Sequence, residues 1–321
     1  MMNDFISIRD LTHDGIRHML ESAGHIKATP SAYAYALKSK SLAMLFEKPS
    51  LRTRVTFDLA IEEMGGHALY LGPSEIQLGK RESVHDVAKN LERMVDGIMI
   101  RTFAHRNVEE LAHHATIPVI NGLSDFSHPC QALADYLTIL EIKGRIQGLK
   151  VTYVGDGNNV ARSLLFAGAL LGANVCIATP EGYELDAESV SWANARSAEC
   201  GGSCTLTYDA VEAATDADVI YTDVWASMGQ ESEVASRATI FRNFQVNGEL
   251  FRRARKDAMF LHCLPAHRGD EVTDEVIDSP NSFVFMQAEN RLHAQKAVLL
   301  ETMYNRPDRM TRRDALQAAA H

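Results

Sequence analysis

Two arginines and two hydroxyl side chains stand together where an apolar stretch gives way to a helical pattern. Residues 42–46 are typical of a buried strand, and residues 55–64 predict a helix. The turn between them holds Ser50, Arg52, Thr53 and Arg54. Unpaired N–H groups and the positive dipole end attract anions to a helix start, and guanidinium groups match phosphate oxygens. The turn therefore predicts a pocket for a small phosphorylated compound; a helix cap with solvated arginines is the alternative.

A second polar turn, residues 128–131, opens a long helical pattern with an imidazole and an amide. The ring of His128 can donate a hydrogen bond to a carbonyl oxygen when its tautomer is fixed. The amide of Gln131 can both donate and accept. The alternative is that His128 only caps the helix, because helix starts recruit polar side chains.

Two later turns offer groups suited to an amine. Asp223 follows the predicted strand 219–222, where a carboxylate can hold an ammonium group; the alternative is an aspartate that caps a turn. Cys263 comes after the predicted strand 259–261 and is a candidate thiol for contact with an amine. A buried structural thiol is the alternative reading of Cys263.

Residues 155–159, Gly-Asp-Gly-Asn-Asn, follow another predicted strand. A dinucleotide-binding fingerprint needs a third glycine where Val160 stands, so the signal for such a site is weak. The amides of Asn158 and Asn159 instead suit the carboxylate or the amine of an amino acid. A polar turn without a ligand is the alternative.

Predicted strands and helices alternate along both halves of the chain, which is typical of parallel sheets covered by helices. The predicted fold class is α/β with two domains, each with a central parallel β-sheet flanked by helices. We expect domains at 1–145 and 146–288, and a C-terminal helix at 289–321 that packs back on the first domain. Ligands of such sheets bind outside the carboxyl ends of the strands. Because all the polar turns fall there, we expect the active site in the interdomain cleft.

Composition excludes several other classes of protein. The chain has 321 residues, 46% of them hydrophobic, and a net charge of -10, which argues against general nucleic-acid binding. The first residues lack the pattern of a signal peptide, and no apolar run is long enough to span a bilayer, so we expect a cytoplasmic protein with no membrane partner. The five cysteines show no C-x-x-C spacing, so we expect no metal site.

Together these motifs resemble those of the aspartate/ornithine carbamoyltransferase family. Residues 50–54, Ser-Leu-Arg-Thr-Arg, are similar to its S-T-R-T-R carbamoyl phosphate motif, and residues 128–131 are similar to its H-P-x-Q motif. Asp223 with Ser-Met-Gly at 227–229 resembles the D-x-x-x-S-M-G loop, and residues 262–265 match H-C-L-P. The motifs occur in family order over nearly the whole chain.

The resemblance implies that residues 1–145 bind carbamoyl phosphate and residues 146–288 bind L-ornithine. The carbamoyl group then passes to the δ-amine, giving L-citrulline and phosphate in arginine metabolism, with no cofactor. The implied carbamoyl phosphate contacts are Ser50, Leu51, Arg52, Thr53, Gln77, Arg101, His128, Gln131, Cys263, Leu264 and Arg291. The implied ornithine contacts are Asn159, Asp223, Ser227 and Met228.

By the same resemblance, Arg101, His128, Asp223 and Cys263 are the catalytic residues. An ornithine ammonium must lose a proton before it attacks, and a dry cleft favours the neutral amine. Asp223 and Cys263 are expected to orient that amine. Arg101, His128 and Thr53 are expected to stabilise the developing oxyanion. Gln77 is expected to reach the active site of a neighbouring subunit, and the resemblance implies a homo-oligomer, a trimer or an assembly of trimers.

One position departs from the family motif, because Leu51 stands where the usual residue is Thr. We keep Leu51 among the carbamoyl phosphate contacts, on the expectation that this position acts through its backbone N–H.

Four alternatives stay open at this stage. An aspartate carbamoyltransferase needs several cations for a dicarboxylate, whereas the second half offers Asp223 and Cys263. Putrescine or an N-acylated ornithine would change only the contacts to the α-groups. A non-catalytic subunit on the same fold has no need of all these polar residues. A nicotinamide-dependent dehydrogenase is disfavoured by the broken glycine pattern.

Overall fold

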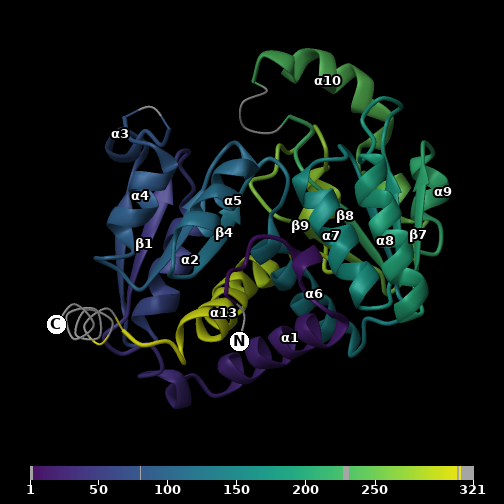
Figure 1. Cartoon of the computed structure of the whole chain (residues 1–321). Coiled ribbons are helices and arrows are strands. Elements are labelled where there is room, and N and C mark those ends of the chain that lie inside the picture. The colour runs from purple at the N-terminus through teal and green to yellow at the C-terminus, as the bar shows by residue number, and fades with distance from the viewer. Residues whose placement is uncertain (1–2, 80, 227–230, 309–310, 312–321) are drawn as a thin grey trace. The chain divides into compact units, whose positions relative to one another are not determined.

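The computed structural model describes residues 3–79, 81–226, 231–308 and 311 (Figure 1). Two compact units make up the chain. Unit 1 comprises Met1–Leu11, Arg17–Leu133 and Arg291–His321, and unit 2 comprises Thr12–Ile16 and Ala134–Asn290. The limits predicted from the sequence, 1–145, 146–288 and 289–321, stay predictions.

Unit 1 contains a four-stranded, all-parallel sheet with the strand order β2-β1-β3-β4. Its strands are β1 (Ser41–Phe46), β2 (His67–Leu71), β3 (Gly97–Arg101) and β4 (Val119–Leu123). The helices between them are α2 (Leu51–Glu62), α3 (Pro73–Ile76), α4 (Val84–Leu91) and α5 (His105–His114). The segment 72–83 between β2 and α4 contains the short helix α3.

The core of unit 1 forms because alternate residues of each strand face one side of the sheet. Ala43 and Leu45 of β1 belong to one buried cluster together with Ile98 and Ile100 of β3 and with apolar residues of α4 and α5. This cluster fixes α4 and α5 side by side over the sheet (Figure 1). The polar ends of the strands are thereby held on a rigid scaffold.

Unit 2 contains a five-stranded, all-parallel sheet with the strand order β7-β6-β5-β8-β9. Its strands are β5 (Lys150–Val154), β6 (Asn174–Ala178), β7 (Ser203–Thr207), β8 (Val219–Thr222) and β9 (Met259–His262). Its helices are α7 (Asn159–Leu170), α8 (Ala187–Cys200), α9 (Ala210–Ala214), α10 (Val234–Ile240), α11 (Gly248–Phe251) and α12 (Asp274–Ile277). Two parallel-sheet units flanked by helices confirm the predicted fold class.

Three longer helices contribute residues to both units. They are α1 (His13–Ala28), α6 (Pro129–Lys143) and α13 (Val284–Met303). The part of α13 in unit 1 packs beneath the sheet, where a Cβ on Gly97 would lie 3.0 Å from the Met303 sulfur. Among the residues that the structure describes, no helix is long and apolar enough to cross a bilayer.

Candidate active site

In unit 1, residues 50–54, which resemble the carbamoyl phosphate motif, follow the strand at which the strand order reverses. β1 is flanked by β2 on one side and by β3 on the other, and Phe46 at the end of β1 is in register with Arg101 at the end of β3. In open α/β sheets, this switch point at the carboxyl ends is where ligands bind. The turn after β1 and the side chain of Arg101 therefore occupy the position expected for a ligand site.

Ser50 forms the start of α2 as its N-cap residue. Its backbone is extended, and its hydroxyl accepts a hydrogen bond from the Thr53 N–H at 3.3 Å. The first N–H groups of α2 have no acceptor within the helix, so they form a favourable place for an anion. The side chain of Leu51 is 75% exposed, which leaves only its backbone to face this place.

Two buried guanidinium groups converge on the hydroxyl of Thr53. Nη1 of Arg101 donates to Thr53 Oγ1 at 3.4 Å, and Nη2 of Arg291 donates to the same oxygen at 3.1 Å. Nη1 of Arg291 also donates to Gln131 Oε1 at 2.8 Å. All four side chains are at most 5% exposed. Because Thr53 Oγ1 accepts from both arginines, its own hydroxyl hydrogen remains to donate to a ligand.

His128 is buried beside this cationic group and is kept neutral. Burial lowers the pKa of His128 well below its usual value, and the positive charges of Arg291, Arg101, Lys48 and Arg52 lower it further. A neutral imidazole can donate one N–H to a carbonyl oxygen without adding another positive charge. The environment of His128 thus suits a hydrogen-bond donor for a carbonyl group.

Lys48 is a member of the cationic group that the sequence interpretation missed. Its side chain is buried, with Nζ 4.5 Å from the centroid of the Phe103 ring. Burial lowers the pKa of Lys48 to about 8, and the neighbouring Arg101 contributes to the same effect. The signal available in the sequence was its position, two residues before the N-cap of α2.

Two further predicted carbamoyl phosphate contacts, Arg52 and Gln77, differ in exposure: Arg52 is half-buried and Gln77 is exposed. Arg52 is half-buried in the first turn of α2 and acts on the pKa of His128 through its charge. Gln77 is exposed at the end of α3, with a left-handed backbone (φ 41°), and is not part of the hydrogen-bonded set around Thr53. This exposed position leaves Gln77 available to another chain.

The polar turns of unit 2 also meet at a switch point. β5 is flanked by β6 and β8, with Tyr153 of β5 in register with Tyr221 of β8. Thr222 at the end of β8 is in register with His262 at the end of β9, so the residues that follow them, Asp223 and Cys263, are neighbours. The two sheets therefore place their candidate groups at equivalent positions.

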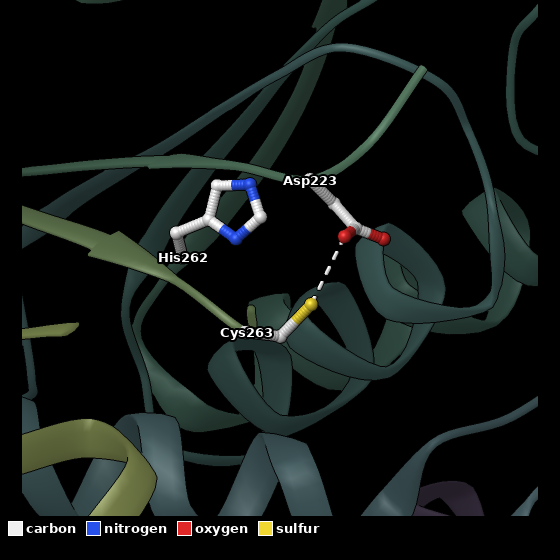
Figure 2. Close-up of side chains that lie close together, drawn as sticks. All are labelled: Asp223, His262 and Cys263. Atoms are coloured by element: carbon white, nitrogen blue, oxygen red, sulfur yellow. Dashed lines mark hydrogen bonds between the residues drawn. The ribbon is translucent and has the colours of Figure 1, made fainter. Parts of the chain in front are cut away.

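A carboxylate and a thiol face each other in this second group. Figure 2 shows the Cys263 sulfur directed at Asp223, with S–H donating to Oδ1 at 3.0 Å. The other carboxylate oxygen accepts from Nδ2 of Asn158 at 2.9 Å. Asp223 is buried, so a carboxylate with these two donors is held in one orientation. The arrangement suits an amine, which can donate to both the carboxylate and the sulfur.

The ring of His262 forms hydrogen bonds with the backbone next to Cys263 and with Glu271. The Leu264 N–H donates to Nδ1 of His262 at 2.9 Å, so Nδ1 is unprotonated and Nε2 carries the hydrogen. Nε2 then donates to Glu271 at 3.1 Å. Asp223, His262 and Cys263 offer three ligand atoms within 4.8 Å of one another. Both ring nitrogens of His262 already have partners, however, so this trio does not fit a metal ion.

The ornithine contacts predicted from the resemblance are described in part. Asn159 is half-buried at the first position of α7, but the hydrogen bond to Asp223 comes from its neighbour Asn158. Asn158 also caps α7 by accepting from the N–H groups of Val160 and Ala161. Ser227 and Met228 lie outside the described residues. The residues around Thr53 belong to unit 1 and those around Asp223 belong to unit 2. That both groups line one cleft between the domains stays a prediction.

A buried ion pair next to Asp223 was also missed from the sequence. Arg237 of α10 donates to Asp156 at 3.0 Å and to the Trp225 carbonyl at 2.8 Å. Burial raises the pKa of Asp156 to about 6 despite this partner. Asp156 and Arg237 are 81 residues apart in the sequence, so only the folded structure shows that they form an ion pair.

Comparison with known proteins gives the same division of roles. The domain described as "Aspartate/ornithine carbamoyltransferase, carbamoyl-P binding domain" matches residues 3–141, and the Asp/Orn binding domain of the same name matches residues 147–302. The chain belongs to the aspartate/ornithine carbamoyltransferase family. The match to the carbamoyl-P binding domain comes first along the chain, and the match to the Asp/Orn binding domain follows it.

Individual members of the family are closely similar. An ornithine carbamoyltransferase of Thermococcus kodakarensis is 58% identical over 94% of this chain and 96% of its own length. An anabolic ornithine carbamoyltransferase of Pyrococcus furiosus is 59% identical over the same shares. The solved structure of an ornithine carbamoyltransferase from Pyrococcus furiosus superposes with a TM-score of 0.92 at 58% identity, covering 95% of this chain and 98% of that one.

Proposed function

We propose that this protein is an ornithine carbamoyltransferase, which transfers the carbamoyl group of carbamoyl phosphate to the δ-amine of L-ornithine and forms L-citrulline and phosphate. The observation that carries the proposal is the convergence of Arg101 and Arg291 on the Thr53 hydroxyl, beside a neutral His128. It provides a dianion site with a hydrogen-bond donor for a carbonyl. The named relatives support the choice of ornithine as the acceptor.

Unit 1 supplies the groups that activate carbamoyl phosphate. The start of α2 with Ser50, Leu51 and Arg52 binds the phosphate, while Arg101, His128 and Thr53 donate to the carbonyl oxygen, where negative charge develops. Because these donors are already held by the fold, little reorganisation is needed as the charge forms. Gln131 fixes the fork of Arg291 and so sets the direction of its remaining donors.

Unit 2 supplies the groups that hold the nucleophile. The Asp223 carboxylate and the Cys263 sulfur position the neutral δ-amine, with Asn159, Ser227 and Met228 proposed for the rest of ornithine. The amine nitrogen attacks the carbonyl carbon, and the bond from that carbon to the phosphate oxygen breaks. The proton that the nitrogen loses passes to the departing phosphate. Leu264 contributes its backbone near the reacting amine.

Assembly and location form a finer part of the proposal. We propose a homotrimer in the cytoplasm, in which Gln77 serves a neighbouring active site. An exposed apolar stripe on α2, formed by Leu51, Val55 and Leu59 at spacings of one helical turn, supports an interface between copies. The described cysteines are free thiols, which suits a reducing compartment.

Two experiments test the proposed function. Citrulline formation is compared for L-ornithine, putrescine, N-acetylornithine and L-aspartate, each with carbamoyl phosphate. We expect a strong preference for L-ornithine. Preference for another amine would keep the phosphate site and overturn the ornithine assignment. No turnover with any amine would favour a non-catalytic subunit.

The proposed assembly is tested separately. Sedimentation should give three times the mass of one chain. Mixed oligomers of Gln77→Ala and Arg101→Ala subunits should regain activity that neither variant has alone.

A further inference from the structure

A buried glutamine of α13 lies behind the two strands that lead to Asp223 and Cys263. Gln287 and its partners Tyr221 and Asp135 are at most 1% exposed. The Gln287 side chain contacts the residue directly before Cys263 and, on the neighbouring strand, the residue two positions before Asp223. Gln287 can therefore act on the thiol and the carboxylate through the strands that carry them.

The first contact of Gln287 continues the hydrogen bonding along the outer edge of β9, the last strand in the order of its sheet. The segment that leads into α13 pairs with this edge: the Phe260 N–H donates to the Asn281 carbonyl at 2.8 Å, and the Phe260 carbonyl accepts from the Phe283 N–H at 3.0 Å. Two residues further along β9, the buried N–H of His262 donates to Oε1 of Gln287 at 2.9 Å. A buried backbone N–H needs such an acceptor. The glutamine side chain thus takes the place of a neighbouring strand at the end of β9.

Two further contacts fix the direction of the Gln287 amide. Nε2 donates to Oδ1 of Asp135 on α6 at 2.6 Å and to the Tyr221 hydroxyl at 3.1 Å. The hydroxyl in turn donates its own hydrogen to Asp135 at 3.4 Å. Because a carboxylate accepts and the His262 N–H donates, a reversed amide would lose both of these contacts. The network therefore holds the Gln287 oxygen on the backbone of β9.

The same amide links the end of β8 to the end of β9. Tyr221 lies on β8, two residues before Asp223, and His262 lies on β9, directly before Cys263. The pairing of the two strands ends at Thr222 and His262. The separation of the next residue on each chain, 3.0 Å between the sulfur and the carboxylate oxygen (Figure 2), therefore depends on how firmly the strand ends are held.

We propose that Gln287 is a positioning residue of the amine site. By holding the His262 N–H and the Tyr221 hydroxyl together, its amide sets the separation of the Cys263 thiol from the Asp223 carboxylate. The inference rests on the proposed carbamoyl transfer, in which these two groups orient the δ-amine. Gln287 acts through the strands and not on the amine itself.

Three substitutions of Gln287 in the full-length protein separate its hydrogen bonds from its volume. Gln287→Met keeps a side chain of similar size and removes the amide. Gln287→Asn keeps the amide but is one carbon too short to bridge Asp135 and the His262 N–H. Gln287→Glu keeps the acceptor for that N–H, and in its protonated form it also donates to Asp135. Phe285→Met, at an exposed residue in the first turn of α13, is the control with the same replacement.

Steady-state kinetics give the first readout. We expect kcat/KM for ornithine to fall roughly 10–100-fold in Gln287→Met and Gln287→Asn, because misplacement of a reacting group by about 1 Å can cost 100-fold. Gln287→Glu and Phe285→Met should stay within about threefold of the parent. KM for carbamoyl phosphate should change little in all variants, because Arg291, four residues further along α13, is the residue that contacts Thr53 in unit 1.

The alkylation rate of Cys263 by iodoacetamide gives a second readout that does not depend on carbamoyl transfer. Mass spectrometry of the peptide that contains Cys263 measures it. A thiol that donates to a carboxylate reacts slowly, because the reactive thiolate would face that negative charge. We expect alkylation to be at least about threefold faster in Gln287→Met and Gln287→Asn than in the parent, and unchanged in Phe285→Met.

Two results would overturn the role of Gln287. One is unchanged kcat/KM and unchanged alkylation in a folded Gln287→Met protein; if circular dichroism shows that this variant does not fold, Gln287→Asn decides in its place. The other is an equal rise in KM for both substrates, which would indicate a general loosening of the fold. A parent protein that forms no citrulline would contradict the proposed function, while the alkylation rates would still test whether Gln287 positions the thiol.

Discussion

The two units use the same position of the same sheet architecture for opposite electrostatic purposes. At its switch point, unit 1 gathers Arg101 and Arg291 around one hydroxyl, with Lys48 close enough to Arg101 to feel its charge, whereas unit 2 gathers a carboxylate, a thiol and an amide. The sheet topology fixes where the groups lie, and the side chains decide whether that position suits an anion or an amine. Variants that change one unit should therefore affect one substrate more than the other.

Arg101→Ala should have the largest effect, on turnover. Loss of a donor to a developing oxyanion typically lowers kcat about 10²–10³-fold, and Arg101 is also one of the two groups that fix the Thr53 hydroxyl. Steady-state kinetics measure the change. Arg106→Ala, at an exposed arginine of α5, is the control and should keep normal turnover. A folded Arg101→Ala enzyme with near-normal kcat would remove Arg101 from the mechanism.

Asp223→Asn should act on the amine side. The amide would replace a charged acceptor of hydrogen bonds from Cys263 and Asn158, and charged hydrogen bonds contribute about 1.5–3 kcal/mol each. We expect kcat/KM for ornithine to fall roughly 100-fold, with little change in the affinity for carbamoyl phosphate. Asp270→Asn, at an exposed aspartate, is the control. An equal loss of affinity for both substrates would contradict the division between the units.

Lys48→Met should give a moderate effect that depends on pH. The pKa of Lys48 is about 8, so the ammonium that attracts a phosphate is present at pH 7 and is lost as the pH rises through 8. We expect about tenfold weaker carbamoyl phosphate binding at pH 7, and a difference that disappears by pH 9. Arg54→Met removes a cation from the same turn, but from an exposed position over the Tyr70 ring, and should change affinity little.

Leu51→Thr should have the smallest effect. The Leu51 side chain is directed to solvent, and the substitution keeps the backbone N–H at the start of α2. We expect KM for carbamoyl phosphate to change less than about twofold, in line with a purely backbone contribution of this residue to the anion site. A gain of tenfold or more would mean that a hydroxyl at this position contacts the phosphate.

Buried strands were predictable because their residues are almost all apolar. Residues 42–46, 219–222 and 259–261 were expected as strands, and β1, β8 and β9 lie there. The edge strand β7 was not expected, because Ser203–Thr207 is largely exposed and carries small polar residues. Likewise, α13 begins at Val284 rather than near residue 289, since its first turn combines residues of mixed polarity.

The candidate site could be predicted in its local parts only. Polar turns after apolar strands are visible in a sequence, so residues such as Thr53, Asp223 and Cys263 could be named as candidates. Contacts between distant residues leave no local signal: Arg291 and Thr53 are 238 positions apart and meet through the packing of α13. The choice between Asn158 and Asn159 likewise depends on which residue becomes the N-cap of α7, and side-chain direction changes by about 100° per helical residue.

The cluster of cations near Thr53 should affect the thermal stability of the protein when no substrate is bound. Positive groups held together this closely repel one another, so a bound dianion relieves the unfavourable energy and stabilises the folded chain by mass action. Inorganic phosphate, the product, can occupy the same place between turnovers. The resting protein should therefore melt at a higher temperature in phosphate than in a chloride buffer of equal ionic strength, and an ordinary metabolite would protect the catalyst from heat.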